Sequence, residues 1–120
     1  MLIYNYMVVD LAESTDRIFH ALADNTRRDI ITFVLHEEHS VSTIARRYPM
    51  SFAAVQKHVA VLERAELVTK RRSGREQMVL GNIATVREAT RLLDQLEAIW
   101  RSRIDRIAEI LNEAPQGDLP

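Results

Sequence analysis

The 120-residue sequence contains no cysteine, which excludes disulfides, thiolate nucleophiles and every metal or redox site built on cysteine. No stretch approaches the roughly eighteen uninterrupted apolar residues of a membrane-spanning helix, so no membrane contact is expected. The chain also lacks a glycine-rich phosphate loop, a Ser-His-Asp or Cys-His pairing in a plausible context, and paired carboxylates facing a pocket. We therefore expect neither an enzyme nor a bound cofactor, and the lack of cysteine fits a cytoplasmic protein.

The chain does have enough apolar residues for a core, and its charge is unevenly distributed. Hydrophobic residues make up 47% and charged residues 28% of the chain, which fits one globular domain. Residues 42–75 hold eight Lys or Arg against two Glu, a formal charge of +6, whereas the remainder carries −7. Such an asymmetry indicates one positive face, which is typical of nucleic-acid binding. The alternative is a solvated charged surface.

Three segments are expected along the chain: an N-terminal extension over residues 1–10, one domain over 11–112 and a flexible tail over 113–120. The extension is apolar but lacks the basic region and cleavage site of a signal peptide. It is expected to form a strand or helical turn that packs on the domain or on a partner. Apolar residues at helical spacing predict a first helix over 11–23.

A second helix is predicted over about 25–36, with Asp24 as its N-cap. Val41 is expected in a very short strand. A short third helix, capped by Ser42 or Thr43, should end at Pro49, because the residue before a proline avoids helical geometry. The residues of the second helix expected in the core are Ile30, Ile31, Phe33, Val34 and Leu35.

Ser51 is expected to cap a fourth helix, which buries Val55, Val59 and Leu62. Two short helices joined by a tight turn make a helix-turn-helix. The following segment, "LVTKRRSGREQMVL", predicts a β-hairpin with Ser73-Gly74 at its turn and basic residues at its tip. Its inward residues are expected to be Val68, Met78 and Leu80.

From residue 83 to about 112 the pattern predicts one uninterrupted helix capped by Asn82. Thirty residues span about 45 Å, against a radius of gyration of about 13 Å for a domain of this size. The apolar stripe of this helix therefore needs another surface, and a second copy of the chain is the economical one. A small-molecule pocket around Trp100 is the less common use of such a stripe. The stripe comprises Ile83, Val86, Leu93, Leu96, Trp100, Ile104, Ile107 and Leu111. Of these, the residues expected at the dimer interface are Leu93, Leu96, Trp100, Ile104 and Ile107.

The polar start and apolar back of the fourth helix suit the DNA major groove, which is about 12 Å wide and admits one helix. Gln56 is expected to read adenine and Phe52 to touch a thymine methyl, while Ser51, Lys57 and His58 bind phosphate. For His58 the alternative is a packing histidine held by hydrogen bonds. The predicted DNA-binding set is Ser51, Phe52, Ala53, Gln56, Lys57, His58, Lys70, Arg71, Arg72 and Arg75.

The stretches "ALADNTRRDIITFV", "STIARRYPMSFAAVQKHVAVLERAELV" and "TKRRSGREQMVL", in this order, resemble the winged helix-turn-helix repressors of the ArsR family. The likeness covers residues 16–111 and is most specific from Ser51 to Val68. It implies a mainly α fold with a small β-hairpin and a long C-terminal dimerisation helix, in the order α-α-α-α-β-β-α. It also implies a homodimer whose first and last helices form the interface. Ile18 and Phe19 of the first helix are therefore expected at this interface together with residues of the apolar stripe.

The metal sites of the family are not matched by this sequence. The cysteine pair of the sensor members is replaced by "VSTIARR", and no histidine follows His58. His36 and His39, with the two glutamates between them, have the i, i+3 spacing that permits a metal site on a helix. Exposed polar residues are, however, expected where a helix ends in a loop, so no metal site is predicted. His20 is read as an interface or core residue.

The sequence therefore predicts a sequence-specific DNA-binding transcriptional regulator, a homodimeric repressor that reads an inverted repeat. Its partners would be double-stranded DNA and a second copy of itself. One alternative is a winged helix that binds protein. A protein-binding wing, however, has little need for four basic residues together with Gln56 and Lys57. Another is a regulator that responds to a small molecule bound at the dimer interface.

Overall fold

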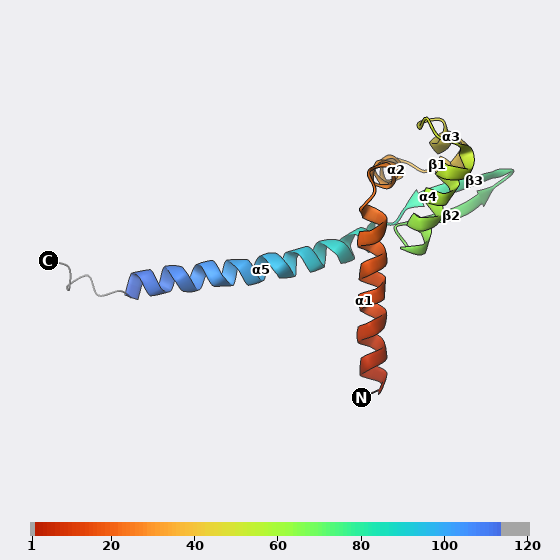
Figure 1. The fold of residues 1–120 in the computed structure, drawn as a ribbon. Coiled ribbons are helices and arrows are strands. Elements are labelled where there is room, and N and C mark those ends of the chain that lie inside the picture. The colour runs from red at the N-terminus through yellow and green to blue at the C-terminus, as the bar shows by residue number, and fades with distance from the viewer. Residues whose placement is uncertain (1, 114–120) are drawn as a thin grey trace. The chain divides into compact units, whose positions relative to one another are not determined.

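The computed structural model describes the backbone of residues 2–113 and the side chains of residues 12–113. Its elements follow the order α1-α2-β1-α3-α4-β2-β3-α5 (Figure 1). Contacts divide the chain after Ala89 into two units, so the first unit includes the first turns of α5. Helices dominate and one small antiparallel sheet accompanies them, which confirms the predicted winged helix-turn-helix fold.

Helix α1 (Leu2–Leu22) begins well before the predicted first helix. Residues 2–10, predicted as a separate extension, continue the same helix, and their side chains lie outside the described part. The predicted tail lies outside it as well, apart from its first residue. Helix α2 (Asn25–His36) has the predicted bounds, and Asp24 caps it by accepting a hydrogen bond from the Arg27 amide at 3.0 Å.

The buried face of α2 is narrower than the sequence suggests. Ile30, Ile31 and Val34 are buried, Phe33 is half-buried, and Leu35 is 41% exposed, so its predicted place in the core is wrong. Successive helical residues are turned by about 100°, which takes Leu35 off the stripe. Its side chain instead lies against Gly81, where an added Cβ would stand 2.5 Å from Leu35 Cδ2.

The third helix starts and ends earlier than predicted. Strand β1 (His39–Ser40) replaces the expected strand at Val41, because these two residues pair with β3. The Ser40 hydroxyl, rather than Ser42 or Thr43, caps α3 (Val41–Ala45) by accepting from the Thr43 amide at 3.1 Å. The helix ends before Pro49 because Arg47 N–H donates to the Ile44 carbonyl, which closes a tighter turn.

Helix α4 (Phe52–Arg64) and the hairpin of β2 (Val68–Ser73) and β3 (Glu76–Gly81) complete the winged motif, and the sheet order is β1-β3-β2. Val68 pairs with Gly81, and side chains two residues apart share a face. Val79 therefore joins Val68 in the core, whereas Met78 and Leu80, predicted inward, are half-buried. The fully buried large side chains are Ile18, Ile30, Ile44, Val55, Val59, Leu62, Leu67, Val68 and Val79.

Helix α5 (Ile83–Glu113) is as long as predicted. Asn82 caps it by accepting a hydrogen bond from the Ala84 amide at 3.2 Å, and its own amide group donates to the Glu66 carbonyl. Thr85 and Ala89 anchor the first turns in the core of the first unit. Within the described residues, no helix is both long enough and apolar enough to cross a membrane.

Candidate nucleic-acid interface

The start of α4 is fixed by a serine cap and by an apolar inner face. Ser51 Oγ accepts a hydrogen bond from the Ala54 amide at 3.1 Å, as predicted, and this bond satisfies one of the free amides of the first turn. Val55, Val59 and Leu62 are fully buried, at the spacing of one helical face. The core therefore sets which side of α4 is turned outward.

The outward side of α4 carries the residues predicted to meet DNA. Phe52 is 47% exposed, although burial of so large an aromatic ring is favourable. Ala53, Gln56 and Lys57 are exposed beside it, and Ser51 is exposed at the cap. An aromatic ring, an amide and an ammonium group thus project from the first turns of one helix.

The same outward side opens on a hollow that the hairpin closes from its other side. The hollow has a volume of about 220 Å³. Gln56 and Phe52 border it from α4, and Lys70 and Arg75 border it from the hairpin. The start of α4 and the basic hairpin therefore face a common space. Its full lining is Val41, Ser42, Phe52, Gln56, Val59, Lys70, Arg75, Glu76 and Gln77.

The hairpin turn comprises Gly74 and Arg75, one residue later than predicted, because Ser73 pairs with Glu76. Gly74 has a φ of +62°, a conformation that glycine adopts without steric cost. Arg75 is thereby placed at the tip. This hairpin, residues 68–81, is the wing.

The four basic residues of the wing are not equivalent. Both carboxylate oxygens of Glu38 accept from Arg71 Nη2, at 2.6 and 2.7 Å, and Lys70 Nζ lies 3.3 Å from Glu63 Oε1. Arg72 and Arg75 are exposed and have no ion pair within the described residues. All four were predicted as DNA-binding residues, because the sequence does not show which glutamates lie beside two of them in the fold.

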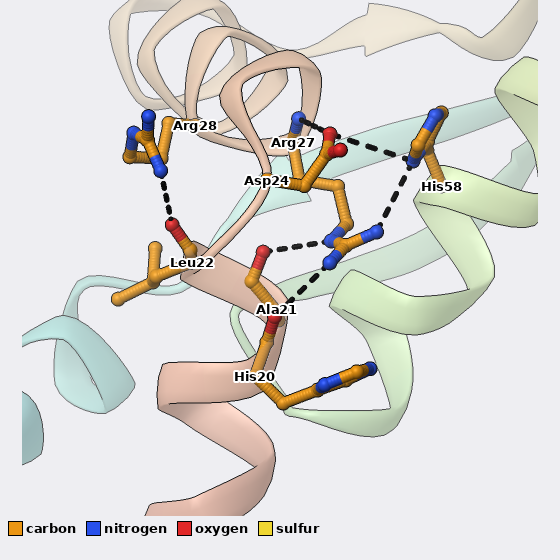
Figure 2. A network of polar contacts seen from close by, with 7 residues as sticks. All are labelled: His20, Ala21, Leu22, Asp24, Arg27, Arg28 and His58. Carbon is orange, nitrogen blue, oxygen red and sulfur yellow. Dashed lines mark hydrogen bonds and ion pairs between the residues drawn. The ribbon is translucent and has the colours of Figure 1, made fainter.

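His58 belongs to a polar network rather than to the outward side of α4. Its Nδ1 lies 3.4 Å from Arg27 Nη1 and 3.8 Å from Asp24 Oδ2, and its side chain is only 23% exposed (Figure 2). The Arg27 guanidinium and the Asp24 carboxylate thus already lie beside His58 Nδ1. The geometry thus favours the packing alternative over the predicted phosphate contact.

Arg27, which the sequence did not single out, holds this network together. Figure 2 shows its guanidinium between the end of α1 and α4, where Nε donates to the Ala21 carbonyl at 2.7 Å and Nη2 to the His20 carbonyl at 3.0 Å. These are carbonyls of the last turn of α1, which have no partner within their own helix. The hydrogen bond that the Arg27 backbone amide donates lowers the pKa of the Asp24 carboxyl below its usual value. Arg27 therefore ties α1, α2 and α4 together.

A second cluster holds the turn between α3 and α4 against α2. Tyr48 donates its hydroxyl to Asp29 Oδ2 at 2.5 Å, and Arg47 lies 3.5 Å from the same oxygen. The Arg47 guanidinium also stacks 3.9 Å above the Phe33 ring. Burial, followed by the bond to Asp29, raises the pKa of Tyr48 to about 12. The turn that orients α4 is thus fixed by polar and aromatic contacts.

His39, one of the two histidines weighed for a metal site, stacks its ring on Phe33 with centroids 3.7 Å apart. Among the residues that the structure describes, no cluster of His, Asp and Glu is arranged to hold a metal ion.

The predicted interface residues fall into two groups. In the second unit, Leu93, Leu96, Trp100, Ile104 and Ile107 are 45–56% exposed, which is unusual for five large apolar side chains on one helix. Ile18, by contrast, is 2% exposed and Phe19 packs on the same core. Ile18 therefore has almost no surface left for a partner, because α1 uses this position to bury its own protomer's core.

Comparisons with known proteins agree with this geometry. An ArsR-like transcriptional regulator from Rhodococcus sp. RHA1 superposes with a TM-score of 0.73 and 31% identity, over 82% of this chain and 93% of that one. The homodimeric winged helix-turn-helix DNA-binding domain of Mb0332 from Mycobacterium bovis, a possible ArsR-family regulator, superposes with a TM-score of 0.62 and 25% identity, over 75% and 82% of the two chains.

In sequence, the chain is 44% identical over 61 residues to the HTH-type transcriptional regulator Rv2034 of Mycobacterium tuberculosis H37Rv. The matched stretch spans 51% of this chain and 57% of that protein. No model of a known protein family matches the chain. The identity and coverage of the Rhodococcus structure nevertheless decide the assignment: the chain belongs to the ArsR family of winged helix-turn-helix transcriptional regulators.

Proposed function

We propose that the chain is a homodimeric repressor that binds an inverted repeat in double-stranded DNA. The observation that carries the proposal is the hollow shared by α4 and the wing. Gln56 borders it from the helix start and Arg75 from the wing tip. A helix start that enters the major groove and a wing that follows the adjacent backbone need this common orientation.

Within each half-site, the exposed residues at the start of α4 read the bases. A glutamine amide matches the donor and acceptor of adenine, and the exposed Phe52 ring matches a thymine methyl. Lys57, Arg72 and Arg75 contact phosphates, because all three are exposed and unpaired within the described residues. His58 takes no part in these contacts and acts through the position of α4.

The homodimer is supported by the apolar stripe of α5. The side chains of Leu93, Leu96 and Trp100 are each more than half exposed, and such a surface is costly to leave in water. The Mb0332 domain is a homodimer with the same fold. A two-fold dimer places two recognition helices about one helical turn of DNA apart, which is why the proposed site is an inverted repeat.

A gel-shift series on DNA selected from a random pool tests this proposal. Gln56→Ala should weaken binding to the selected site by about 1–3 kcal/mol per half-site and relax base preference at one position. Random DNA should lose much less affinity, because its binding rests on phosphate contacts. Gln95→Ala, which removes the same exposed group from α5, is the matched control.

Two results would contradict the proposal. Equal losses on selected and random DNA for Gln56→Ala would show that this residue reads no base. An affinity independent of salt would show that the protein makes no phosphate contacts, and would favour a winged helix that binds protein.

A further inference from the structure

Two basic residues of the proposed DNA-binding wing, Lys70 and Arg71, are held in ion pairs. Because they are adjacent on β2, their side chains lie on opposite faces of the hairpin. Glu38 comes from the loop between α2 and β1, and Glu63 from the outward side of α4. They reach Arg71 and Lys70 on β2, respectively. Each glutamate is separated from its partner along the chain, so the pairs exist only because the fold brings α2, α4 and the sheet together.

These pairs contribute little to stability. The side chains of Arg71 and Glu38 are 52% and 38% exposed, and those of Lys70 and Glu63 are 25% and 44% exposed. Exposed ion pairs add little to the free energy of unfolding, because water screens the attraction and two side chains lose freedom. Holding the fold together is therefore a poor explanation for the presence of these two pairs on the wing.

Their effect on phosphate binding is larger. A carboxylate bonded to a guanidinium occupies part of the donors that a phosphate would use, and its own charge repels the DNA backbone. For Arg71 the arrangement is tight, since both oxygens of Glu38 accept from one nitrogen. A phosphate that approaches Arg71 or Lys70 therefore competes with a glutamate for donors and meets the repulsion of its charge.

We infer that Glu38 and Glu63 are positioning residues that withhold Arg71 and Lys70 from DNA, so that the wing contacts phosphate through Arg72 and Arg75 alone. This inference rests on the proposed function and refines it. The glutamates limit the sequence-independent part of the affinity, which grows with the number of phosphates contacted. The protein is thereby kept from binding every duplex tightly.

Salt dependence of binding to random DNA measures the number of phosphate contacts directly. Glu38→Gln keeps the shape of the side chain but removes its charge, which frees Arg71. If Arg71 then reaches phosphate in both protomers, the slope of log affinity against log salt steepens by about 1.8. Between 200 and 50 mM salt the variant should gain about tenfold more affinity than the unmodified protein. Glu63→Gln should do the same through Lys70.

Glu37→Gln is the matched control for Glu38→Gln, because it removes the same charge from an exposed neighbour that has no ion pair within the described residues. It should raise affinity slightly and leave the slope unchanged. Adjacent arginines give a second comparison: Arg72→Ala should flatten the slope by about 1.8, and Arg71→Ala should change it little. The double variant Glu38→Gln/Arg71→Ala should return to the original slope.

Three outcomes would overturn the inference. Equal slopes for Glu38→Gln and Glu37→Gln would show that only net charge matters. Weaker binding by Glu38→Gln would show that Glu38 presents Arg71 to phosphate, and equal flattening by Arg71→Ala and Arg72→Ala would show that both already make contact. Failure of the proposed function looks different, because the unmodified protein itself would then show no salt-dependent binding.

Discussion

The junction of α1, α2 and α4 allows a sharp test of how the recognition helix is held. Asp24→Ala removes the carboxylate that accepts from the Arg27 amide at 3.0 Å and lies 3.8 Å from His58 Nδ1. Loss of a cap costs about 0.5–2 kcal/mol. Because the Asp24 side chain is 37% exposed, solvent weakens its charge interactions, and we expect a loss of about 1 kcal/mol in the free energy of unfolding.

The pH dependence of this loss has a defined sign. The hydrogen bond from the Arg27 backbone amide holds the pKa of Asp24 below its usual value of 3.8. The ionised carboxylate is therefore the form that the fold stabilises. That contribution is complete above the usual value and disappears as the pH falls through the lower value in the folded protein. Asp24→Asn retains a capping oxygen and should lose less than the alanine variant at pH 7.

Urea unfolding of the three proteins, at fixed protein concentration because dimers unfold in a concentration-dependent way, gives the free energies. The order of stability at pH 7 should be Asp24, then Asn, then Ala. At a pH below the folded-state pKa, Asp24 and the asparagine variant should converge. The reasoning is refuted if Asp24→Ala unfolds like the unmodified protein at pH 7, or if Asp24→Asn is as destabilised as Asp24→Ala.

Two further changes test the local geometry around the end of α4. Glu66 has a φ of +61°, a conformation that costs a residue other than glycine about 1 kcal/mol. Glu66→Gly should therefore raise the urea midpoint of unfolding. A lower midpoint would show that Glu66 is unstrained. Leu62→Ala opens a cavity at a fully buried position and should cost about 2–5 kcal/mol in the same assay, whereas a loss below about 1 kcal/mol would place Leu62 outside a tightly packed core.

Local signals in the sequence were sufficient for much of the fold. The bounds of α2 and the caps at Asp24 and Ser51 follow from side chains that bond amides three residues away, and these were predicted correctly. The buried stripe of α4 follows from spacing alone. Such features depend on neighbours within one or two turns, which a single sequence displays directly.

The features that the sequence does not show arise where distant segments meet. β1 exists because His39 and Ser40 pair with β3, and Val79 faces the core because of its register with β2. His58 meets Arg27 across 31 positions of the chain, and Arg71 meets Glu38 across 33. No local pattern encodes these partners, so the sequence does not show that Lys70 and Arg71 of the wing are ion-paired.

The two roles weighed for His58, a phosphate contact and a packing histidine, require different surroundings for its ring. His58 lies two residues after Gln56 on α4, within the stretch that carries the DNA-reading residues. Helical rotation nevertheless turns it toward the junction with α1 and α2, where Asp24 and Arg27 surround it. Only the packing of three helices distinguishes the two environments.

The central claim is that the start of α4 and the tip of the wing contact one DNA duplex together. The most direct measurement is a ¹⁵N NMR titration of the protein with DNA selected from a random pool, following backbone amide signals. The account predicts that signals of residues 51–57 and 72–76 shift together and saturate at the same DNA concentration. Shifts confined to one of these two segments, or centred on α5, would contradict it.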